Sequence, residues 1–203
     1  TKDQALASPH LEGFKSKKIP VLIMTDAIDQ FWLPMVGSFK EKKFTSITQG
    51  QINLDDLDEK NKDKKKDDKN EKEKKDKEYV DLVAQLKVVL GDQVKDIRLS
   101  SKLTDSPVCL VADEGDMDIA MEQLMAQRDT NYKGAPRILE INGDHSLIKN
   151  MKSLLSKKEN NDLVSDAGTL LFEQARLMEG KMPADPAQFS KIMNQFLLKA
   201  IPN

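Results

Sequence analysis

The chain has 203 residues, a formal net charge of −2 and 38% hydrophobic residues. Its near-neutral charge argues against a dedicated nucleic-acid binder, which usually shows a clear basic excess. No apolar run approaches the roughly 18–20 residues that a membrane span needs. The one cysteine, Cys109, cannot form an intrachain disulfide and fits a reducing cytosol. We therefore expect a cytoplasmic protein with neither nucleic-acid nor membrane partners. The start at Thr1, with no initiator methionine and no apolar signal region, predicts a piece of a longer protein.

Residues 1–54 are expected to form a small α/β unit. Hydrophobic spacing predicts a helix, a buried strand, a helix and a second strand, over residues 2–17, 19–24, 27–36 and 43–47. Pro9 implies a break in the first helix, and Pro34 should shorten or distort the second. Asp26 can cap the second helix. This order of elements, with short joins, predicts a parallel pair of strands.

A charged run follows this unit. Every residue between Asp58 and Glu78 is Lys, Asp, Glu or Asn, with ten Lys against nine acids. Opposite charges permit i,i+4 pairs, so a solvated helix can form, but no side chain in the run can anchor a core. We expect a linker over residues 55–78 that can turn helical towards Tyr79. An interaction tail is the alternative.

Residues 79–203 are expected to form a mixed three-stranded α+β domain that ends in a helical hairpin. A helix should begin at Tyr79 and stop at Gly91. Its predicted apolar face comprises Val80, Val83, Ala84, Leu86, Val88 and Leu90. Strands are predicted over residues 94–99, 107–112 and 137–142, and the second should lie beside the first. Further helices are predicted over residues 117–128, 145–157, 162–178 and 185–199. Gly115 or Asp116 can cap the first of these.

The last two predicted helices are strongly amphipathic. Their apolar side chains are Leu163, Leu170, Leu171, Phe172, Leu177, Met178, Phe189, Ile192, Met193, Phe196 and Leu197. A helical hairpin cannot bury two wide apolar faces by itself. It must pack on the preceding α/β layer, on a second copy of the chain, or on both. Pairing with a second copy would make a four-helix bundle across a two-fold axis.

Four stretches resemble the bacterial ninety-kilodalton heat-shock chaperones of the HtpG type. The first is Ser-Pro-His-Leu-Glu at 8–12, together with the predicted strand and helix start at 21–29. The second is the segment 94–107, which ends in Arg-Leu-Ser-Ser-Lys-Leu-Thr-Asp-Ser-Pro. The third is residues 139–145, and the fourth is Asp-Pro-Ala-Gln-Phe at 185–189. Gly143 replaces the proline that the family typically has in the third stretch. Together the four stretches cover nearly the whole chain in the family's order.

The resemblance implies a domain organisation and a function. Residues 1–54 would be the last subdomain of the middle domain, and residues 79–203 the C-terminal dimerisation domain. The ATP-binding domain, with its ATP and Mg, would lie outside this chain, so the chain itself would not be an enzyme and would hold no cofactor. Its partners would be a second copy, non-native client proteins and co-chaperones. The implied dimer interface comprises Leu170, Leu171, Leu177, Met178, Phe189, Ile192, Met193, Phe196 and Leu197.

Two groups of side chains are candidates for client contact. Met117, Met121, Leu124 and Met125 recur at i, i+4, i+7 and i+8, which places them on one helical face. Met is flexible and adapts to many partners. A Met stripe is by itself more often core, but the resemblance implies that this helix faces the central cleft of the dimer.

Phe31 and Trp32 form the second candidate. The family has Trp where this chain has Phe31, and here the Trp has moved by one place. One residue rotates a side chain by about 100° around a helix. We therefore expect one of the two to be exposed and the other packed. The alternative is that both lie in the core of the small N-terminal unit.

Two other classes of function stay open. A purely structural dimerisation module would bury the Met stripe. An enzyme would need a convergent polar pocket, and the sequence offers few candidates. His10 and His145 are far apart, Cys109 lies in a predicted buried strand where an inert thiol is the default, and no phosphate-binding glycine loop or metal-ligand spacing is present.

Overall fold

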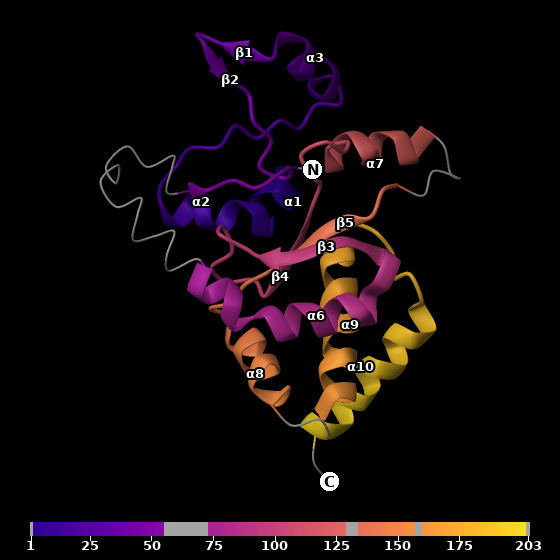
Figure 1. Ribbon diagram of the computed structural model, residues 1–203. Helices are drawn as coiled ribbons and strands as arrows, with labels where there is room; N and C mark the ends of the chain where they lie inside the picture. Colours follow the sequence, from indigo (N-terminus) through magenta and orange to yellow (C-terminus); the bar gives the residue numbers. More distant parts are fainter. Residues whose placement is uncertain (1, 55–72, 129–133, 157–159, 202–203) are drawn as a thin grey trace.

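The computed structural model describes residues 2–54, 73–128, 134–156 and 160–201. They form an α+β fold, as predicted, with a three-stranded sheet at its centre and a two-stranded hairpin near the N-terminus. The hairpin and the helix before it lie at one end of the molecule, and the last two helices lie at the other (Figure 1). Among these residues, no helix combines the length and apolarity needed to cross a membrane.

The N-terminal segment begins with a helix that is interrupted at Pro9, as predicted. Its elements are α1 (Lys2–Leu6), η1 (Pro9–Leu11), α2 (Glu12–Ser16), α3 (Asp29–Val36), β1 (Ser38–Phe39) and β2 (Lys42–Lys43). Pro9 opens the short η1 helix, where its missing N–H costs nothing, and the hydroxyl of Ser8 accepts a hydrogen bond from the backbone N–H of His10. α3 keeps Pro34 inside it and ends at Gly37, which has a positive φ of 66°.

The predicted parallel strand pair of this segment is wrong. Residues 19–24 form no strand, and Leu22 is 75% exposed. Of the predicted strand 43–47, only Lys43 lies in a strand, and it pairs with Ser38 in an antiparallel hairpin. A strand needs the backbone of a partner for its hydrogen bonds. The turn at Lys40 and Glu41, both with positive φ, brings the chain back onto its own preceding residues instead.

The charged run lies mostly outside the described residues. Its last six residues, 73–78, are helical, as predicted. They lead into α6 (Val80–Leu90), which ends at Gly91. The predicted apolar face of α6 is partly wrong, because Val80 and Val88 are exposed whereas Leu82, Leu86 and Leu90 are buried. The helix packs on three leucines at i, i+4 and i+8, with Val83 and Val89 partly buried beside them, and turns only Val80 and Val88 to solvent.

The three predicted strands of the central sheet form, but their order differs from the prediction. β3 (Val94–Leu99), β4 (Val108–Val111) and β5 (Arg137–Ile141) are arranged β3-β5-β4. β5 runs parallel to β3 and antiparallel to β4 and lies between them. All five residues of β5 are buried, which suits a central strand, whereas β3 exposes Lys95 at the edge.

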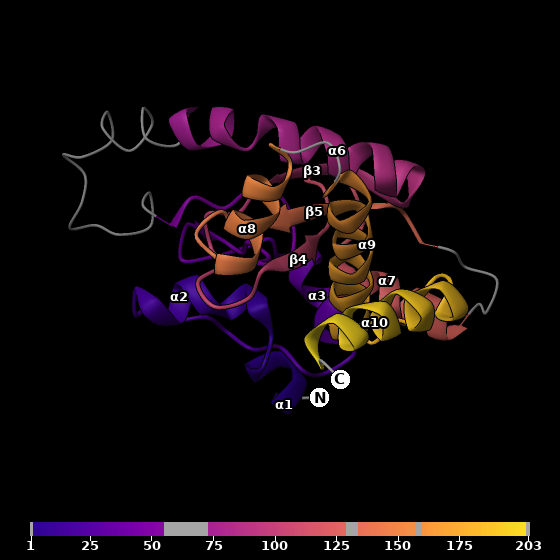
Figure 2. The ribbon, with the colours of Figure 1, turned by 90° about the horizontal axis from the view of Figure 1, so that it is seen from below.

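The two faces of this sheet carry different layers. α6, α8 (Ser146–Leu154) and α9 (Asn161–Met178) cover one face, as Figure 2 shows from below. The main core lies there and includes Leu86, Leu110, Leu139, Ile148 and Phe172. The opposite face carries a smaller apolar cluster of Leu103, Cys109, Val111 and Ile138. The N-terminal segment packs on this second side.

Polar contacts fasten the N-terminal segment to the sheet. The carboxylate of Glu12 accepts hydrogen bonds from the backbone N–H groups of Thr104, Asp105 and Ser106, at 2.8, 2.9 and 3.1 Å. Burial alone would raise the pKa of Glu12, but these bonds and the Ser106 hydroxyl outweigh it and lower the pKa. Gly13 is required at this contact, because a Cβ there would lie 2.5 Å from the carbonyl oxygen of Lys102.

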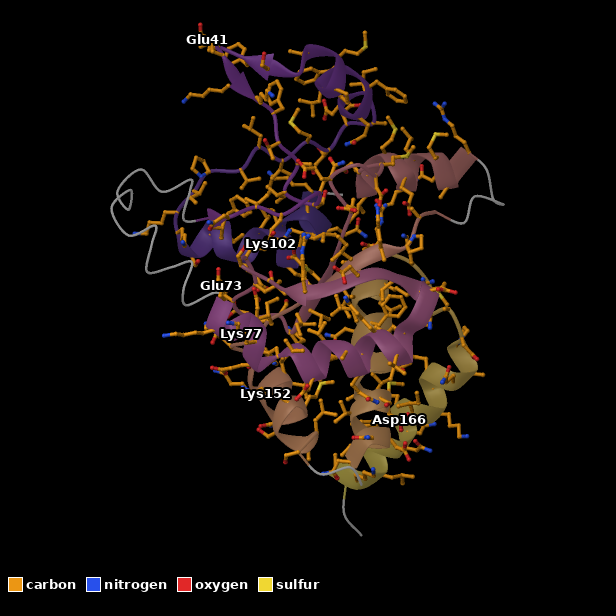
Figure 3. All side chains as sticks on the ribbon, in the orientation of Figure 1. Glu41, Glu73, Lys77, Lys102, Lys152 and Asp166 are labelled. Carbon is orange, nitrogen blue, oxygen red and sulfur yellow. The ribbon has the colours of Figure 1, made fainter. Side chains whose placement is uncertain are left out.

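A buried charge cluster holds the returning part of this segment. Lys102 is only 1% exposed and lies in the interior, where its Nζ donates to the carbonyl oxygen of Ile47 at 2.9 Å (Figure 3). Arg98 donates to the carbonyl oxygen of Gly50 at 2.8 Å and pairs with Glu140 at 2.9 Å. Both cations therefore hold backbone carbonyls of residues 47–50 against the sheet.

Candidate functional site

The helix that carries most of the Met stripe is α7 (Ile119–Arg128). Of its ten residues, all of which the structure describes, two are buried: Ile119 and Glu122. Its cap is Asp118, whose Oδ1 accepts the backbone N–H of Ala120 at 2.9 Å, and not the predicted Gly115 or Asp116. α7 therefore rests on the molecule along a narrow face, and most of its surface is open.

The Met stripe lies on the open side of α7. We call Met117, Met121, Leu124 and Met125 the Met face. Met121 and Leu124 are half-buried, and Met117 and Met125 are 41% and 40% exposed. Met117 precedes the first helical turn, since the helix begins at Ile119. None of the four side chains is buried in the chain's own core.

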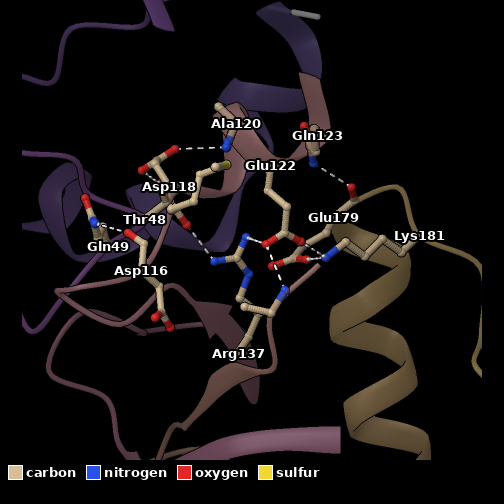
Figure 4. Close-up of polar contacts among 12 residues, drawn as sticks. Thr48, Gln49, Asp116, Asp118, Ala120, Glu122, Gln123, Arg137, Glu179 and Lys181 are labelled. Atoms are coloured by element: carbon tan, nitrogen blue, oxygen red, sulfur yellow. Dashed lines mark hydrogen bonds and ion pairs between the residues drawn. The ribbon is translucent and has the colours of Figure 1, made fainter. Parts of the chain in front are cut away.

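One carboxylate joins the start of α7 to the N-terminal segment. Besides capping the helix, Asp118 accepts hydrogen bonds at Oδ2 from the hydroxyls of Ser46 and Thr48, the second at 2.8 Å (Figure 4). The side chain of Gln49 donates to the carbonyl oxygen of Asp116 at 2.7 Å. Gln49 also forms a parallel bridge with Ala112, next to β4. Residues 46–49 thus set where α7 begins.

A second group of charges lies under the middle of α7. Glu122 pairs with Arg137 of β5, and both side chains are 4% exposed. Lys181 contacts Glu122 at 3.0 Å and Glu179 at 3.2 Å. Burial raises the pKa of Glu179, against the opposing effect of Lys181. Figure 4 shows these side chains converging from α7, β5 and the end of α9.

Phe31 and Trp32 lie in different environments, as the rotation between neighbouring residues of a helix predicts. Phe31 is 41% exposed. Trp32 packs edge-on against Phe44, with ring centroids 6.1 Å apart, and its Nε1 donates to Asp29 at 2.8 Å. The same helix exposes Met35 and Val36, which the sequence reasoning did not select. Phe31 is therefore the member of the pair that is free to touch a partner.

The C-terminal hairpin consists of α9 and α10 (Pro186–Ala200). Asp185 caps α10, as predicted, and accepts the backbone N–H groups of Ala187 and Gln188 at 3.0 and 2.9 Å. Leu171 and Ile192 are buried within the chain's own fold. Leu170, Phe189 and Phe196 are half-buried, and Phe196 packs against the main core.

α10 also carries a second, outward apolar stripe. It comprises Met193, Leu197, Leu198 and Ile201, which are 40%, 49%, 77% and 69% exposed. Leu177 and Met178 at the end of α9 are exposed as well. Leu198 and Ile201 were not selected from the sequence. Ile201 could have been found there, because it continues the i, i+4 row of Met193 and Leu197.

The groups that could serve catalysis are poorly placed for it. His10 is buried, and desolvation with the charge of Lys102 lowers its pKa to about 3, so its ring stays neutral at physiological pH. The ring of His145 caps α8 by accepting the backbone N–H of Leu147. Burial raises the pKa of the Cys109 thiol, which keeps it protonated and unreactive. Among the described residues, no three His, Cys, Asp or Glu side chains converge as metal ligands do.

Comparison with known proteins gives a consistent set of relatives. The model of the family described as Hsp90 protein matches residues 1–202. The chaperone protein HtpG of Roseobacter denitrificans is 42% identical over 196 residues, which are 96% of this chain and 31% of that relative. The HtpG of Paramagnetospirillum magneticum is 39% identical over 98% of this chain and 32% of its own length. The HtpG of Streptomyces coelicolor is 36% identical over 92% of this chain and 28% of its own length.

The chain thus spans less than a third of the length of the curated relatives it matches. The residues that the family model matches include α7 and the C-terminal hairpin. Since the family model covers residues 1–202, the chain belongs to the Hsp90 family of heat-shock chaperones.

Proposed function

We propose that this chain is the part of an HtpG-type chaperone that pairs two subunits and contacts non-native client proteins. Residues 1–54 would be the end of the middle domain, residues 55–78 a linker, and residues 79–203 the dimerisation domain. ATP binding and hydrolysis, and any contact with co-chaperones, would involve the remainder of a longer protein in the cytoplasm. The observation that carries the proposal is the Met face, left open on α7 in a member of this family.

The Met face supports client contact through its chemistry. Non-native proteins expose varied apolar segments, and flexible thioether side chains can repack against many shapes. The half-exposed state of the four side chains provides apolar surface to a partner without a large solvent-exposed patch. Phe31 would add an aromatic contact from α3.

The outward stripe of α10 supports pairing with a second copy. α10 already buries Ile192 against its own chain, so Met193, Leu197, Leu198 and Ile201 face away from that core. Two such helices related by a two-fold axis would bury the stripe of each on the other, and α9 would complete a four-helix bundle. Dimerisation would tether the two arms at high effective concentration, so that closure driven elsewhere in the molecule can act on a client between them.

Substitution of the Met face tests client contact. Met121→Gln with Leu124→Gln should weaken binding of a reduced, carboxymethylated, permanently unfolded protein such as α-lactalbumin by roughly tenfold, because the two changes together remove about 1–2 kcal/mol of apolar contact. Fluorescence anisotropy of the labelled client measures the affinity. Sedimentation velocity should show an unchanged dimer.

Val80→Gln with Val88→Gln is the matched control, since both valines are exposed apolar side chains on another helix. It should leave client affinity unchanged. If the variant in the Met face binds the client as tightly as the parent does, the face is not a client site, and a purely structural dimerisation module becomes the better interpretation.

A further inference from the structure

The attachment of α7 is unusually polar for a helix that would carry a binding face. Ile119, at its first position, is its one buried apolar side chain, and the second buried side chain is the carboxylate of Glu122. A helix is normally oriented by an apolar stripe that fits into the surface beneath it. Here that role falls to Glu122, three residues further along the same face.

The carboxylate of Glu122 binds two elements at once. Its Oε2 accepts from the guanidinium of Arg137, and its Oε1 lies 3.0 Å from the Nζ of Lys181. Arg137 also donates to the carbonyl oxygen of Met117 at 2.9 Å, so it holds the chain two residues before α7 begins as well. Beside them, Gln123 donates to the carbonyl oxygen of Glu179 at 2.8 Å. α7 is thus held to β5 on one side and to the end of α9 on the other (Figure 4).

The surrounding chain is shaped to accept this carboxylate. Gly134 has a φ of +70°, and a Cβ placed there would lie 2.4 Å from Oε1 of Glu122. The backbone N–H of Ala135 donates to Oε2 at 3.4 Å. A side chain at position 134 would therefore displace the carboxylate, whereas glycine lets the backbone close over it.

We propose that Glu122 is a positioning residue for client contact: by binding Arg137 and Lys181 together, its carboxylate fixes the orientation of α7, and so of the Met face, relative to the α9–α10 hairpin. This inference rests on the proposed function of the Met face. Client affinity would then depend on the orientation of α7 relative to the hairpin as well as on the side chains of the Met face. Because Lys181 lies in the turn between α9 and α10, the helices proposed to pair the subunits would also orient the client face.

Two substitutions separate this role from general stability. Glu122→Gln removes the charge at the centre of the cluster but leaves Arg137 without its buried partner, so it can unfold the region. Lys181→Met is the milder change. It keeps the pair of Glu122 and Arg137 and removes only the ionic connection to the hairpin, leaving the Gln123 hydrogen bond in place. Glu179, whose pKa burial raises, can take up a proton in compensation. Glu114→Gln, an exposed acid in the loop before α7, is the control.

The orientation of α7 is measured in the full chain by pulsed electron paramagnetic resonance. Nitroxides at Gln127→Cys on α7 and Gln174→Cys on α9, both exposed positions, report the distance between the helices, and dilution with unlabelled chain removes signals between subunits. The buried Cys109 should stay unlabelled. Binding of carboxymethylated α-lactalbumin is measured with the same variants.

The expected result is a broadened distance distribution and client binding weakened by roughly threefold to tenfold in Lys181→Met, with Glu114→Gln like the parent. Met121→Gln with Leu124→Gln should weaken client binding without broadening the distribution. An unchanged distribution in both Lys181→Met and Glu122→Gln would overturn the inference. So would a broadened distribution with unchanged client affinity, and in that case the Met face would still be a client site. If the parent itself binds no client, the proposed function fails, and the positioning role fails with it.

Discussion

His10 is a buried side chain whose titration should be visible in the stability of the protein. Its pKa in the folded chain is lowered to about 3 from an ordinary value near 6.5. Between these values the unfolded chain binds one more proton than the folded chain, so the stability that His10 contributes is complete above the upper value and is lost as the pH falls towards the lower one.

We therefore expect the unfolding free energy of the parent to fall by roughly 1.4 kcal/mol per pH unit between pH 6 and pH 4, beyond the change seen in His10→Gln. Urea unfolding at several pH values measures the unfolding free energy of the parent and of His10→Gln. Parallel pH profiles for the two proteins would show that His10 is protonated as readily in the folded chain as in the unfolded one.

Gly13 makes a second prediction at the scale of one residue. A methyl group there would lie 2.5 Å from the carbonyl oxygen of Lys102 and 3.0 Å from its Cα, and backbone atoms cannot yield as a flexible side chain does. Gly13→Ala should destabilise the chain by about 1–3 kcal/mol. Gly115→Ala is the matched control, because its Cβ would meet no atom within 4 Å. Thermal unfolding compares the two variants with the parent. Equal melting temperatures for Gly13→Ala and Gly115→Ala would contradict the close contact at Gly13.

At the scale of elements, α10 has two apolar sides in different environments. One side, with Ile192, packs on the chain's own core, and the other, with Leu197, faces solvent in the single chain. The sequence predicted the helix and its amphipathic character, and it left open whether the apolar positions pack on the chain's own α/β layer, on a second copy, or on both. Periodicity shows where apolar residues lie on a helix, but it does not show how many neighbours the helix has.

Leu197→Asp tests the outward stripe. In a two-fold interface the change occurs twice, and each copy loses about 1.5–3 kcal/mol of apolar burial. The dimer dissociation constant should therefore rise by roughly a hundredfold or more. Gln195→Asp adds the same charge at an exposed polar position of the same helix and should leave the dimer intact. Analytical ultracentrifugation measures the dimer dissociation constant of each variant. An unchanged constant in Leu197→Asp would exclude this stripe from the interface.

At the scale of the whole molecule, polar contacts join the N-terminal segment to the central sheet. Glu12 binds three successive backbone N–H groups, and Lys102 and Arg98 hold the carbonyl oxygens of Ile47 and Gly50. The single tryptophan, Trp32, lies in the N-terminal segment, so its fluorescence reports that part separately from the circular dichroism of the whole chain.

Glu12→Gln should loosen this junction, because a neutral amide offers one acceptor where the carboxylate offers two charged ones. We expect a loss of about 1–3 kcal/mol and a Trp32 transition that precedes the circular dichroism transition in urea. Since the pKa of Glu12 is lowered, the same loss should occur in the parent as the pH falls through that lowered value. Glu41→Gln, at the exposed turn of the β1–β2 hairpin (Figure 3), is the control. Coincident and unshifted transitions in Glu12→Gln would show that the junction does not depend on this carboxylate.

The sequence by itself determined the elements of the C-terminal part. Alternating apolar residues predicted β3, short apolar runs predicted β4 and β5, and Asp185 with Pro186 marked the start of α10, because these signals depend on neighbours along the chain. The motifs at 8–12, 94–107, 139–145 and 185–189 were enough to suggest the family. In the N-terminal segment the same reasoning failed for residues 19–24, since an apolar run forms a strand only where another strand supplies its hydrogen bonds.

The tertiary structure alone decided which elements meet and which side chains remain open. It placed β5 between β3 and β4, turned Leu82 of α6 inward and Val88 outward, and left the Met face accessible. It also brought Glu122, Arg137 and Lys181 together from three parts of the chain. No periodic pattern marks such a cluster, because each residue is an ordinary charged side chain in its own segment. Burial and mutual pairing, which only the fold creates, make it the anchor of α7.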